Sequence, residues 1–386
     1  MNFTKILLLI FGVTFLSCST QKSTDATHVT EDVVVFQPTE TYASTRIPAL
    51  VATNKGTLLA FCEGRIGSAS DWADMNLIMR RSVDGGKTWA GIQILDRMKG
   101  APVGNPTPIV DDRGTIHLLY QKDYARAYHI VSNDDGRSWS QPVEITYAFD
   151  RFKPEYDWKV LAPGPGHGIQ MKNGRLLAAV WLANSAKLTP RRSHHPSCVS
   201  TIYSDDYGKT WQRGEIVADN SREIKDPNES MPVLLSDGSV LLSIRNPSAV
   251  KRRAFSTSKS GIDQWSNVRF AEELFDPTCM ASIVSMKKHR KHALLFVNPD
   301  SEHIEKHPRQ NLTAKVSLDD GKTWPLKKVL NPGASGYSDL AVDKKGNIFC
   351  LYETNTSKND GWSYSLVLKK MNANWIFKNN KRSARH

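Results

Sequence analysis

Short alternations of apolar and polar residues, each following a turn, recur along most of the chain. Five begin at a turn glycine and a sixth lacks it; they cover Gly56–Glu63, Gly114–Gln121, Gly174–Trp181, Gly238–Arg245, Lys291–Asn298 and Gly346–Glu353. No long 3.6-residue periodicity competes with this pattern, so helix should be scarce. Strands repeated at nearly regular intervals predict radial repetition of small sheets. The fold expected is therefore an all-β, six-bladed β-propeller.

A second repeat, an octapeptide with Ser, Asp, Gly and Trp at fixed places, supports the same architecture. Its four copies are Ser82–Trp89, Ser132–Trp139, Ser204–Trp211 and Ser317–Trp324, and a degenerate copy surrounds Ser256, Gly261 and Trp265. In a hairpin turn the Asp carboxylate can accept turn N–H groups, Gly supplies a positive φ, and Trp packs under its blade. We therefore interpret these aspartates as structural rather than catalytic.

The residue seven positions after each turn is polar or aromatic, although apolar residues precede it. These residues are Glu63, Gln121, Trp181, Arg245, Asn298 and Glu353. Equivalent positions of the blades of a propeller lie on a ring around its axis. One face of the disc is therefore expected to carry a polar, partly charged mouth, where a ligand should bind.

The amino-acid composition excludes several classes of protein, and the net charge indicates the kind of partner. With 40% hydrophobic and 23% charged residues in 386, the chain is neither disordered nor collagenous nor a polytopic membrane protein. Lys and Arg exceed Asp and Glu by 51 − 39 = 12, which favours an anionic partner. Because no nucleic-acid-binding fold or stripe of basic and aromatic residues accompanies this charge, nucleic acid is not expected as the partner.

Histidines and cysteines give no sign of a metal site. The pairs His194 with His195 and His289 with His292 lack carboxylate or thiolate partners at ligand spacing, so we expect them on solvated loops and expect no metal. Four cysteines lie far apart and are interpreted as buried strand residues, with one disulfide as the alternative: Cys62, Cys198, Cys279 and Cys350.

The N-terminal segment is typical of an exported protein. Lys5 precedes the apolar run Ile6–Leu16, which is too short to span a bilayer, so residues 1–17 are expected to be a signal peptide. The sequence before Cys18 resembles a bacterial lipoprotein cleavage site, so Cys18 is expected to be lipidated; an ordinary secretory signal is the alternative. The protein should then contact a membrane only through this lipid, in the periplasm or at the cell surface.

The remaining boundaries follow from composition. Residues 18–30 are polar and are expected to form a flexible tether, residues 31–376 the propeller, and residues 377–386 a basic tail. The strand Val33–Phe36 is expected to close the last blade against the C-terminal segment. A monomer is expected.

Several motifs, in their order along the chain, resemble the exo-sialidases (neuraminidases) of the Asp-box, or BNR repeat, family. The octapeptides resemble its Asp boxes, and the other matching segments are Thr45–Pro48, Phe61–Arg65, Gly164–Gln170, Asn228–Ser230, Ser243–Asn246, Arg309–Thr313 and Gly336–Leu340. The resemblance spans nearly the whole chain, from Thr45 to about Tyr352. It implies a retaining glycoside hydrolase that releases terminal sialic acid from glycoconjugates without a metal or organic cofactor.

The resemblance also implies residues that bind the substrate. Arg46, Arg245 and Arg309 match the three arginines that bind the carboxylate of sialic acid, which an Arg fork holds through two parallel charge-assisted hydrogen bonds. Glu353 matches the glutamate that orients the first arginine. Further implied substrate-binding residues are Arg65, near the 4-hydroxyl of the sugar, Asn105, Trp72 and Trp181.

The implied catalytic residues are Tyr337, Glu229 and Asp71. The anomeric carbon of sialic acid bears a carboxylate, so an anionic nucleophile would be repelled there, whereas a neutral phenol is not. Tyr337 would attack, Glu229 would take its proton, and Asp71 would protonate the leaving group and then activate water, giving retention. Asp74 is the alternative to Asp71.

Two other functions would use the same arginines. A non-catalytic sialic-acid lectin on this propeller would not need the three catalytic side chains. A propeller polysaccharide lyase acting on uronates would not need the Glu–Tyr pair.

Two residues depart from the family. Met280 stands in place of a common glutamine, and Trp181 lies in a strand where some members carry tyrosine; both concern recognition of the glycerol tail and aglycone rather than the chemistry.

Overall fold

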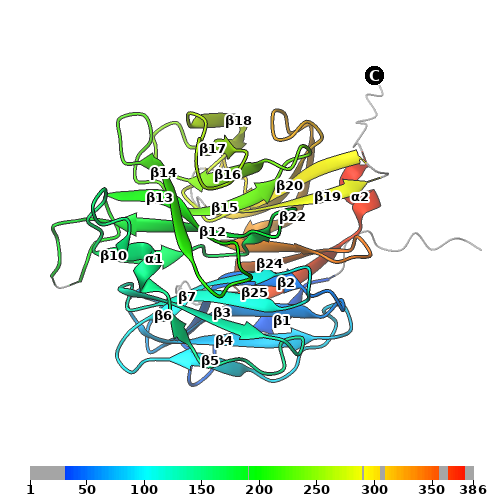
Figure 1. The fold of residues 1–386 in the computed structure, drawn as a ribbon. Coiled ribbons are helices and arrows are strands. Elements are labelled where there is room, and N and C mark those ends of the chain that lie inside the picture. The colour runs from blue at the N-terminus through cyan, green and yellow to red at the C-terminus, as the bar shows by residue number, and fades with distance from the viewer. Residues whose placement is uncertain (1–30, 190, 289–290, 305–308, 356–363, 379–386) are drawn as a thin grey trace, which may run out of the picture.

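The chain forms six antiparallel sheets arranged as the blades of a propeller (Figure 1). The computed structural model describes residues 31–189, 191–288, 291–304, 309–355 and 364–378. The first three blades are β2 (Ser44–Ala52), β3 (Leu58–Ile66), β4 (Asp74–Ser82) and β5 (Gln93–Arg97); β6 (Val103–Val110), β7 (Ile116–Lys122), β8 (Arg126–Ser132) and β9 (Val143–Glu144); and β10 (Val160–Pro163), β12 (Leu176–Ala183), β13 (Ser197–Ser204) and β14 (Gln212–Asp219), with β11 (Ile169–Gln170) added to β12.

The other three blades continue in chain order. They are β15 (Asn228–Leu234), β16 (Val240–Arg245), β17 (Arg252–Ser258) and β18 (Arg269–Phe275); β19 (Ser282–Lys288), β20 (Lys291–Pro299), β21 (Gln310–Ser317) and β22 (Leu326–Ala334); and β23 (Ser338–Val342), β24 (Ile348–Thr354), β25 (Ser365–Met371) and β1 (Val33–Phe36). The predicted six-bladed propeller is confirmed. The six alternating segments of the sequence are the second strands, β3, β7, β12, β16, β20 and β24.

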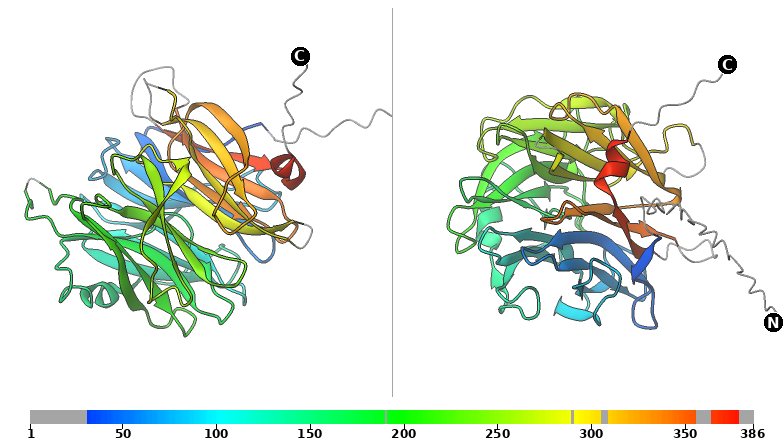
Figure 2. Two further views of the ribbon diagram at one scale, coloured as in Figure 1. Left: turned by 90° about the horizontal axis from the view of Figure 1, so that it is seen from above. Right: turned by 90° about the vertical axis from the view of Figure 1, so that its right-hand side faces the viewer.

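The last blade is completed by the first strand of the described chain. β1 pairs antiparallel with β25, with Val33 opposite Leu368 and Phe36 opposite Leu366, as predicted for Val33–Phe36. Figure 2 shows the red C-terminal strand beside the blue N-terminal ones. The ring is thus closed by hydrogen bonds between segments from opposite ends of the fold.

Helix is as scarce as expected in the described part of the chain. It holds two five-residue helices, α1 (Thr146–Asp150) and α2 (Ala373–Phe377), and neither is long and apolar enough to cross a membrane. α2 extends to Phe377, one residue past the expected end of the propeller, and buries Ile376. The predicted signal peptide, Cys18, the tether and residues 379–386 of the tail lie outside the described residues.

The octapeptides form the expected turns. In the first, Asp84 Oδ1 accepts hydrogen bonds from the N–H groups of Lys87 and Thr88 at 3.0 Å, and Asp84 Oδ2 accepts one from the Thr88 hydroxyl at 2.6 Å. These bonds from Thr88 lower the pKa of Asp84. Equivalent bonds from the Ser or Thr four residues on recur at Asp134, Asp206 and Asp319. In the degenerate copy, Ser258 rather than Ser256 accepts from the N–H of Gly261.

The four cysteines in the described ranges are buried free thiols, so the alternative of a disulfide is wrong. Cys62, Cys198 and Cys350 lie in strands as predicted. Cys279 instead lies in the turn between β18 and β19.

A pair of buried histidines stacks between blade 2 and the Asp box of blade 3. His117 Nδ1 lies 3.1 Å from His129 Nε2, and His117 Nε2 lies 3.3 Å from Asp111 Oδ2. The ring of Trp211 packs edge-on against His129 at 5.5 Å. Burial lowers the pKa of His117 and lowers that of His129 to about 3.

This pair predicts acid sensitivity of the fold. The folded-state pKa values lie below the unfolded value of about 6.5, so the stability contributed by the neutral histidines is present above pH 6.5 and is lost as pH falls toward their folded values. Each histidine can steepen the loss by up to about 1.4 kcal/mol per pH unit. Urea unfolding between pH 7 and pH 4 measures it. His129→Phe should flatten the profile, whereas His303→Gln, at an exposed position, should not; equal profiles for all three proteins would refute the prediction.

Candidate active site

The predicted site residues meet at one face because of how the strands run. The inner strands β2, β6, β15, β19 and β23 all begin at this face, and the second strands end there. Arg46 and Glu229 therefore lie near the starts of inner strands, whereas Arg245 and Glu353 lie near the ends of second strands. Tyr337 directly precedes β23.

Local irregularities in the strands turn side chains toward the axis. The pairing registers shift between Arg46 and Ala49, between Gly104 and Thr107, and between Asn228 and Ser230. Ile47 and Asn105 in two of these bulges have φ values of 62° and 57°. A bulge bends its strand and redirects neighbouring side chains, which is why bulges are frequent beside functional sites.

A cavity of about 200 Å³ opens at this face. Its walls are Arg46, Asp71, Trp181, His194, His195, Asn228, Glu229, Arg245, Arg309 and Tyr337. The three predicted catalytic residues and the three predicted carboxylate-binding arginines are all among them. The structure therefore brings together six residues that the sequence separates by up to 291 positions (337 − 46).

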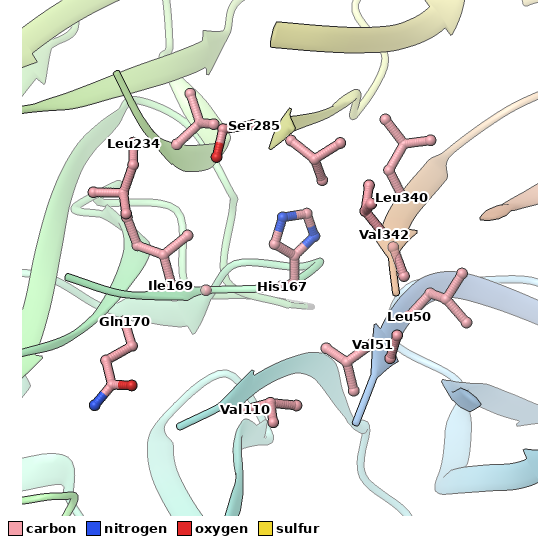
Figure 3. A pocket seen from close by; sticks show the side chains of 15 residues that line it. Leu50, Val51, Val110, His167, Ile169, Gln170, Leu234, Ser285, Leu340 and Val342 are labelled. Carbon is pink, nitrogen blue, oxygen red and sulfur yellow. The ribbon is translucent and has the colours of Figure 1, made fainter. Parts of the chain in front are cut away.

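A second cavity, of about 250 Å³, lies at the opposite ends of the inner strands (Figure 3). His167 points into it from among apolar side chains such as Leu50, Val110 and Leu340, and His167 Nδ1 lies 2.7 Å from Asp339 Oδ1. The described lining of this cavity includes no carboxylate and no arginine. The first cavity, which gathers the six predicted residues, is the candidate active site.

Three guanidinium groups surround one tyrosine. The Cζ atoms of Arg46, Arg245 and Arg309 lie 5.2, 5.7 and 5.4 Å from the centroid of the Tyr337 ring. Glu353, which is fully buried, accepts from Arg46 Nε at 3.1 Å and from Arg46 Nη2 at 3.2 Å. Three guanidinium groups this close can direct charge-assisted hydrogen bonds at one ligand, which favours a planar anion such as a carboxylate.

Tyr337 and Glu229 form a direct pair. The Tyr337 hydroxyl lies 2.9 and 2.7 Å from the two carboxylate oxygens of Glu229, and Arg245 Nη1 donates both to Glu229 and, at 3.2 Å, to the Tyr337 oxygen. Burial, reinforced by Glu229, raises the pKa of Tyr337 although Arg245 opposes the shift. The phenol is therefore neutral and hydrogen-bonded to a base, as an activated nucleophile requires.

Asp71 stands at the rim of the cavity on the loop between β3 and β4. Its side chain is half exposed, and Asp71 Oδ1 lies 2.9 Å from Arg65 Nη1 and 3.6 Å from Arg46 Nη1. Partial burial opposes their effect, but the two guanidinium groups hold the pKa of Asp71 below its usual range. Asp74, the alternative, accepts the N–H of Gly100 and does not line the cavity.

Three other predicted substrate contacts, Arg65, Asn105 and Trp72, are not among the residues that line the cavity. Arg65 is buried and donates to Glu63 from Nε and Nη2 at 3.0 and 2.7 Å, so it orients Asp71 with its remaining nitrogen. The N–H of Asn105 donates to Glu63, while Asn105 Oδ1 is buried without a protein partner. Trp72 packs 5.0 Å from the ring of Tyr124, at the edge of the site.

The predicted polar ring is correct in part. Trp181 and Arg245 line the cavity directly. Glu353 accepts a hydrogen bond from Arg46, which lines the cavity, and Glu63 accepts one from Arg65, which contacts Asp71. Asn298 does not belong to the mouth, because its amide donates to the carbonyl of Phe275 and accepts from Lys315 inside the protein.

The sequence interpretation missed His194. Expected on a solvated loop, it instead packs 5.3, 4.7 and 5.2 Å from the rings of Trp72, Tyr124 and Trp181. Burial lowers the pKa of His194 to about 4, so the imidazole is neutral near pH 7. The position of His194 in the connection that follows Trp181, at the mouth end of β12, was the signal available. His292, also expected on a loop, lies in strand β20 instead. His289 is outside the described residues.

Comparison with known proteins connects this arrangement to a family. The model of the BNR repeat-like domain matches residues 56–350. A sialidase of Micromonospora viridifaciens is 31% identical over 363 residues, covering 85% of this chain and 52% of the relative, and a sialidase of Bacteroides fragilis is 29% identical over 352 residues, covering 82% and 61%. The chain thus spans little more than half the length of these curated relatives. The structure of the Hadza microbial sialidase Hz136 superposes with a TM-score of 0.71 at 26% identity, over 87% of this chain and 67% of that one.

Proposed function

Because the chain belongs to the BNR repeat-like family, we propose that it is an exo-α-sialidase that hydrolyses terminal sialic acid from glycoconjugates. One observation carries the proposal: the hydroxyl of Tyr337 lies within hydrogen-bond distance of both carboxylate oxygens of Glu229, inside a cluster of three arginines. The similarity to curated sialidases supports it. A phenol paired with a carboxylate, beneath cations that bind an anion, suits attack at an anomeric carbon bearing a carboxylate.

The arginine cluster accounts for the substrate class. Arg46, Arg245 and Arg309 come from three blades and keep their charge at any working pH. A substrate carboxylate between them would accept parallel hydrogen bonds and place the adjacent anomeric carbon over Tyr337.

The remaining groups supply proton transfer for a retaining reaction. Glu229 takes the proton of the Tyr337 hydroxyl as its oxygen bonds to the anomeric carbon, while Asp71 gives a proton to the departing glycosidic oxygen. Asp71 then removes a proton from the water that attacks the tyrosyl intermediate, and Glu229 returns the proton to Tyr337. Two displacements at one carbon restore its original configuration.

The pKa of Asp71 is low in the free protein, and substrate binding would raise it as this scheme requires. A general acid must hold its proton, but Arg65 and Arg46 favour the ionised form of Asp71. A substrate carboxylate bound to Arg46 would offset part of that positive field and raise the pKa of Asp71 toward a working range.

A fluorogenic α-sialoside tests the function directly. The wild-type protein should release a free saturated sialic acid, with the α-anomer appearing first in NMR spectra. Binding without turnover would support a lectin instead, and an unsaturated product absorbing in the ultraviolet would support a lyase.

Arg309→Lys is expected to lower kcat/KM by at least about 10²-fold, since an ammonium group keeps the charge but cannot replace the guanidinium fork. Arg309 Nη2 also donates to the carbonyl of Thr278 at 2.7 Å, a contact that fixes its orientation. Methyl esterification of the sialoside carboxylate should cause a comparable loss with the wild-type protein. Full activity on the ester would remove the basis for the arginine cluster.

We also propose that the protein is exported and anchored through a lipid on Cys18, from the sequence of residues 1–18 alone. Labelling of cells with a palmitate analogue should mark the wild-type protein. Cys18→Ala should abolish the label and either release the protein from the membrane fraction or block its processing. An unlabelled wild-type protein would favour the ordinary secretory signal.

A further inference from the structure

One backbone carbonyl joins two of the three arginines. The carbonyl oxygen of Thr278 accepts from Arg245 Nη2 at 3.1 Å and from Arg309 Nη2 at 2.7 Å. Arg245 belongs to blade 4 and Arg309 directly precedes a strand of blade 5. The direction of this single carbonyl therefore affects the spacing of two guanidinium groups on neighbouring blades.

The turn that presents this carbonyl has an unfavourable backbone conformation. Thr278 has a φ of 59°, a left-handed value that a β-branched residue rarely adopts. Such a conformation is strained and persists only where its surroundings hold it.

A buried ion pair holds the turn from behind. Asp276 Oδ1 accepts from the N–H of Cys279 at 3.0 Å, and this N–H belongs to the same planar peptide group as the Thr278 carbonyl. Asp276 Oδ2 pairs with Arg253 Nη1 at 3.2 Å, and the same nitrogen donates to the carbonyl of Cys279 at 3.2 Å. Because N–H and C=O point in opposite directions in a trans peptide, holding the N–H on Asp276 aims the carbonyl at the arginines.

Both charged side chains are fully buried, which stability alone does not explain. A buried ion pair often contributes no more stability than apolar residues of similar volume. Arg253 also donates to the hydroxyl of Ser243 at 2.9 Å, on the strand that ends in Arg245. The pair thus ties the Thr278 turn to the strand that carries one of the arginines.

We propose that Asp276 and Arg253 are positioning residues for carboxylate recognition, acting through the Thr278–Cys279 peptide on Arg245 and Arg309. This inference rests on the proposed sialidase function. It assigns to Asp276 an effect on discrimination between a carboxylate and its ester that general loss of stability would not produce.

The test compares kcat/KM for a fluorogenic α-sialoside with kcat/KM for its methyl ester, for each protein. The value for the acid divided by the value for the ester is a ratio that does not depend on the fraction of molecules that are folded. Asp276→Ala removes the acceptor and should lower the ratio at least about tenfold, mainly through a higher KM for the acid. Asp276→Asn keeps an acceptor for the N–H of Cys279 and should lower the ratio less.

A matched control separates this effect from the loss of any buried ion pair. Asp135 pairs with Arg81 and accepts from Thr53 and Thr57 at a buried position outside the cavity wall. Asp135→Ala should reduce stability and leave the ratio at the wild-type value. If Asp276→Ala does not fold, the double variant Arg253→Met/Asp276→Leu, which replaces the pair with apolar side chains, should fold and show the lowered ratio.

The outcomes distinguish this inference from the proposed function. A wild-type protein that prefers the acid, with Asp276 variants that keep its ratio, would overturn the inference and leave the sialidase proposal intact. A wild-type protein that cleaves neither substrate would overturn both.

Discussion

Tyr337→Phe is expected to fold normally and to lose kcat by at least about 10³-fold, the order of loss seen when a catalytic nucleophile is removed. Phenylalanine retains the ring, whose centroid lies within 5.7 Å of the Cζ atom of each of the three arginines, so the packing of the site should survive. What disappears is the oxygen held 2.7 Å from Glu229 Oε2. Kinetics and the thermal midpoint, measured on the same preparation, separate loss of chemistry from loss of fold.

A mechanism-based label tests the same assignment by showing which residue becomes covalently modified. A 3-fluorosialyl fluoride should leave a covalent adduct that peptide mass spectrometry locates on Tyr337, and Tyr337→Phe should carry none. Tyr352→Phe is a matched control, because Tyr352 is a buried tyrosine of the same blade whose hydroxyl bonds to Asp32 at 2.8 Å; this variant should still be labelled. An adduct on Glu229 or Asp71 would refute the assignment of the nucleophile.

Trp211→Ala and Trp324→Ala are each expected to lower the free energy of unfolding by about 3–5 kcal/mol, the usual cost of truncating a large buried aromatic side chain. Both indoles are 1% exposed. Trp324 packs 5.8 Å from the ring of Phe296, and Trp211 belongs to the core of blades 2 and 3. Trp89 and Trp139 are only partly buried, so the same truncation should cost less at these two positions.

Urea unfolding of the four Trp→Ala variants measures this difference, with Trp89→Ala as the internal reference. The specific activity of the folded fraction should stay near the wild-type value, since none of these tryptophans lines the cavity. Normal stability with abolished turnover would show that the Asp boxes have a catalytic role after all.

The sequence predicted the fold well because the repeats that define it are local. A turn followed by an alternating strand is specified within about ten residues, and six such units at similar intervals leave few architectures. The strand Val33–Phe36 could be paired with the last blade because a propeller of this kind must close its ring. The bulge at Ile47 and the turn at Thr278 carry no such local signal, since tertiary contacts hold their left-handed conformations.

The candidate site could be predicted where a segment resembles a motif of the exo-sialidases, as with Arg46, Glu229 and Tyr337. His194 was missed because the rings of Trp72 and Tyr124, which pack against it, come from blades 1 and 2, and the only sequence signal was its position after Trp181. Asn298 was misplaced for the opposite reason. It occupies the expected register position, but Lys315 engages its amide from the adjacent strand.

The pairing of β1 with β25 also has a consequence for how the protein matures. Val33 is synthesised 335 residues before its partner Leu368 (368 − 33), so the ribosome must complete five blades before the sixth can form. Contacts of such sequence separation are slow to form, because the loop-closure entropy is lost before the contact is gained. The blade that waits for this step carries both Tyr337 and Glu353. If the protein is the sialidase proposed above, a nascent chain should therefore show no turnover until β1 and β25 have paired.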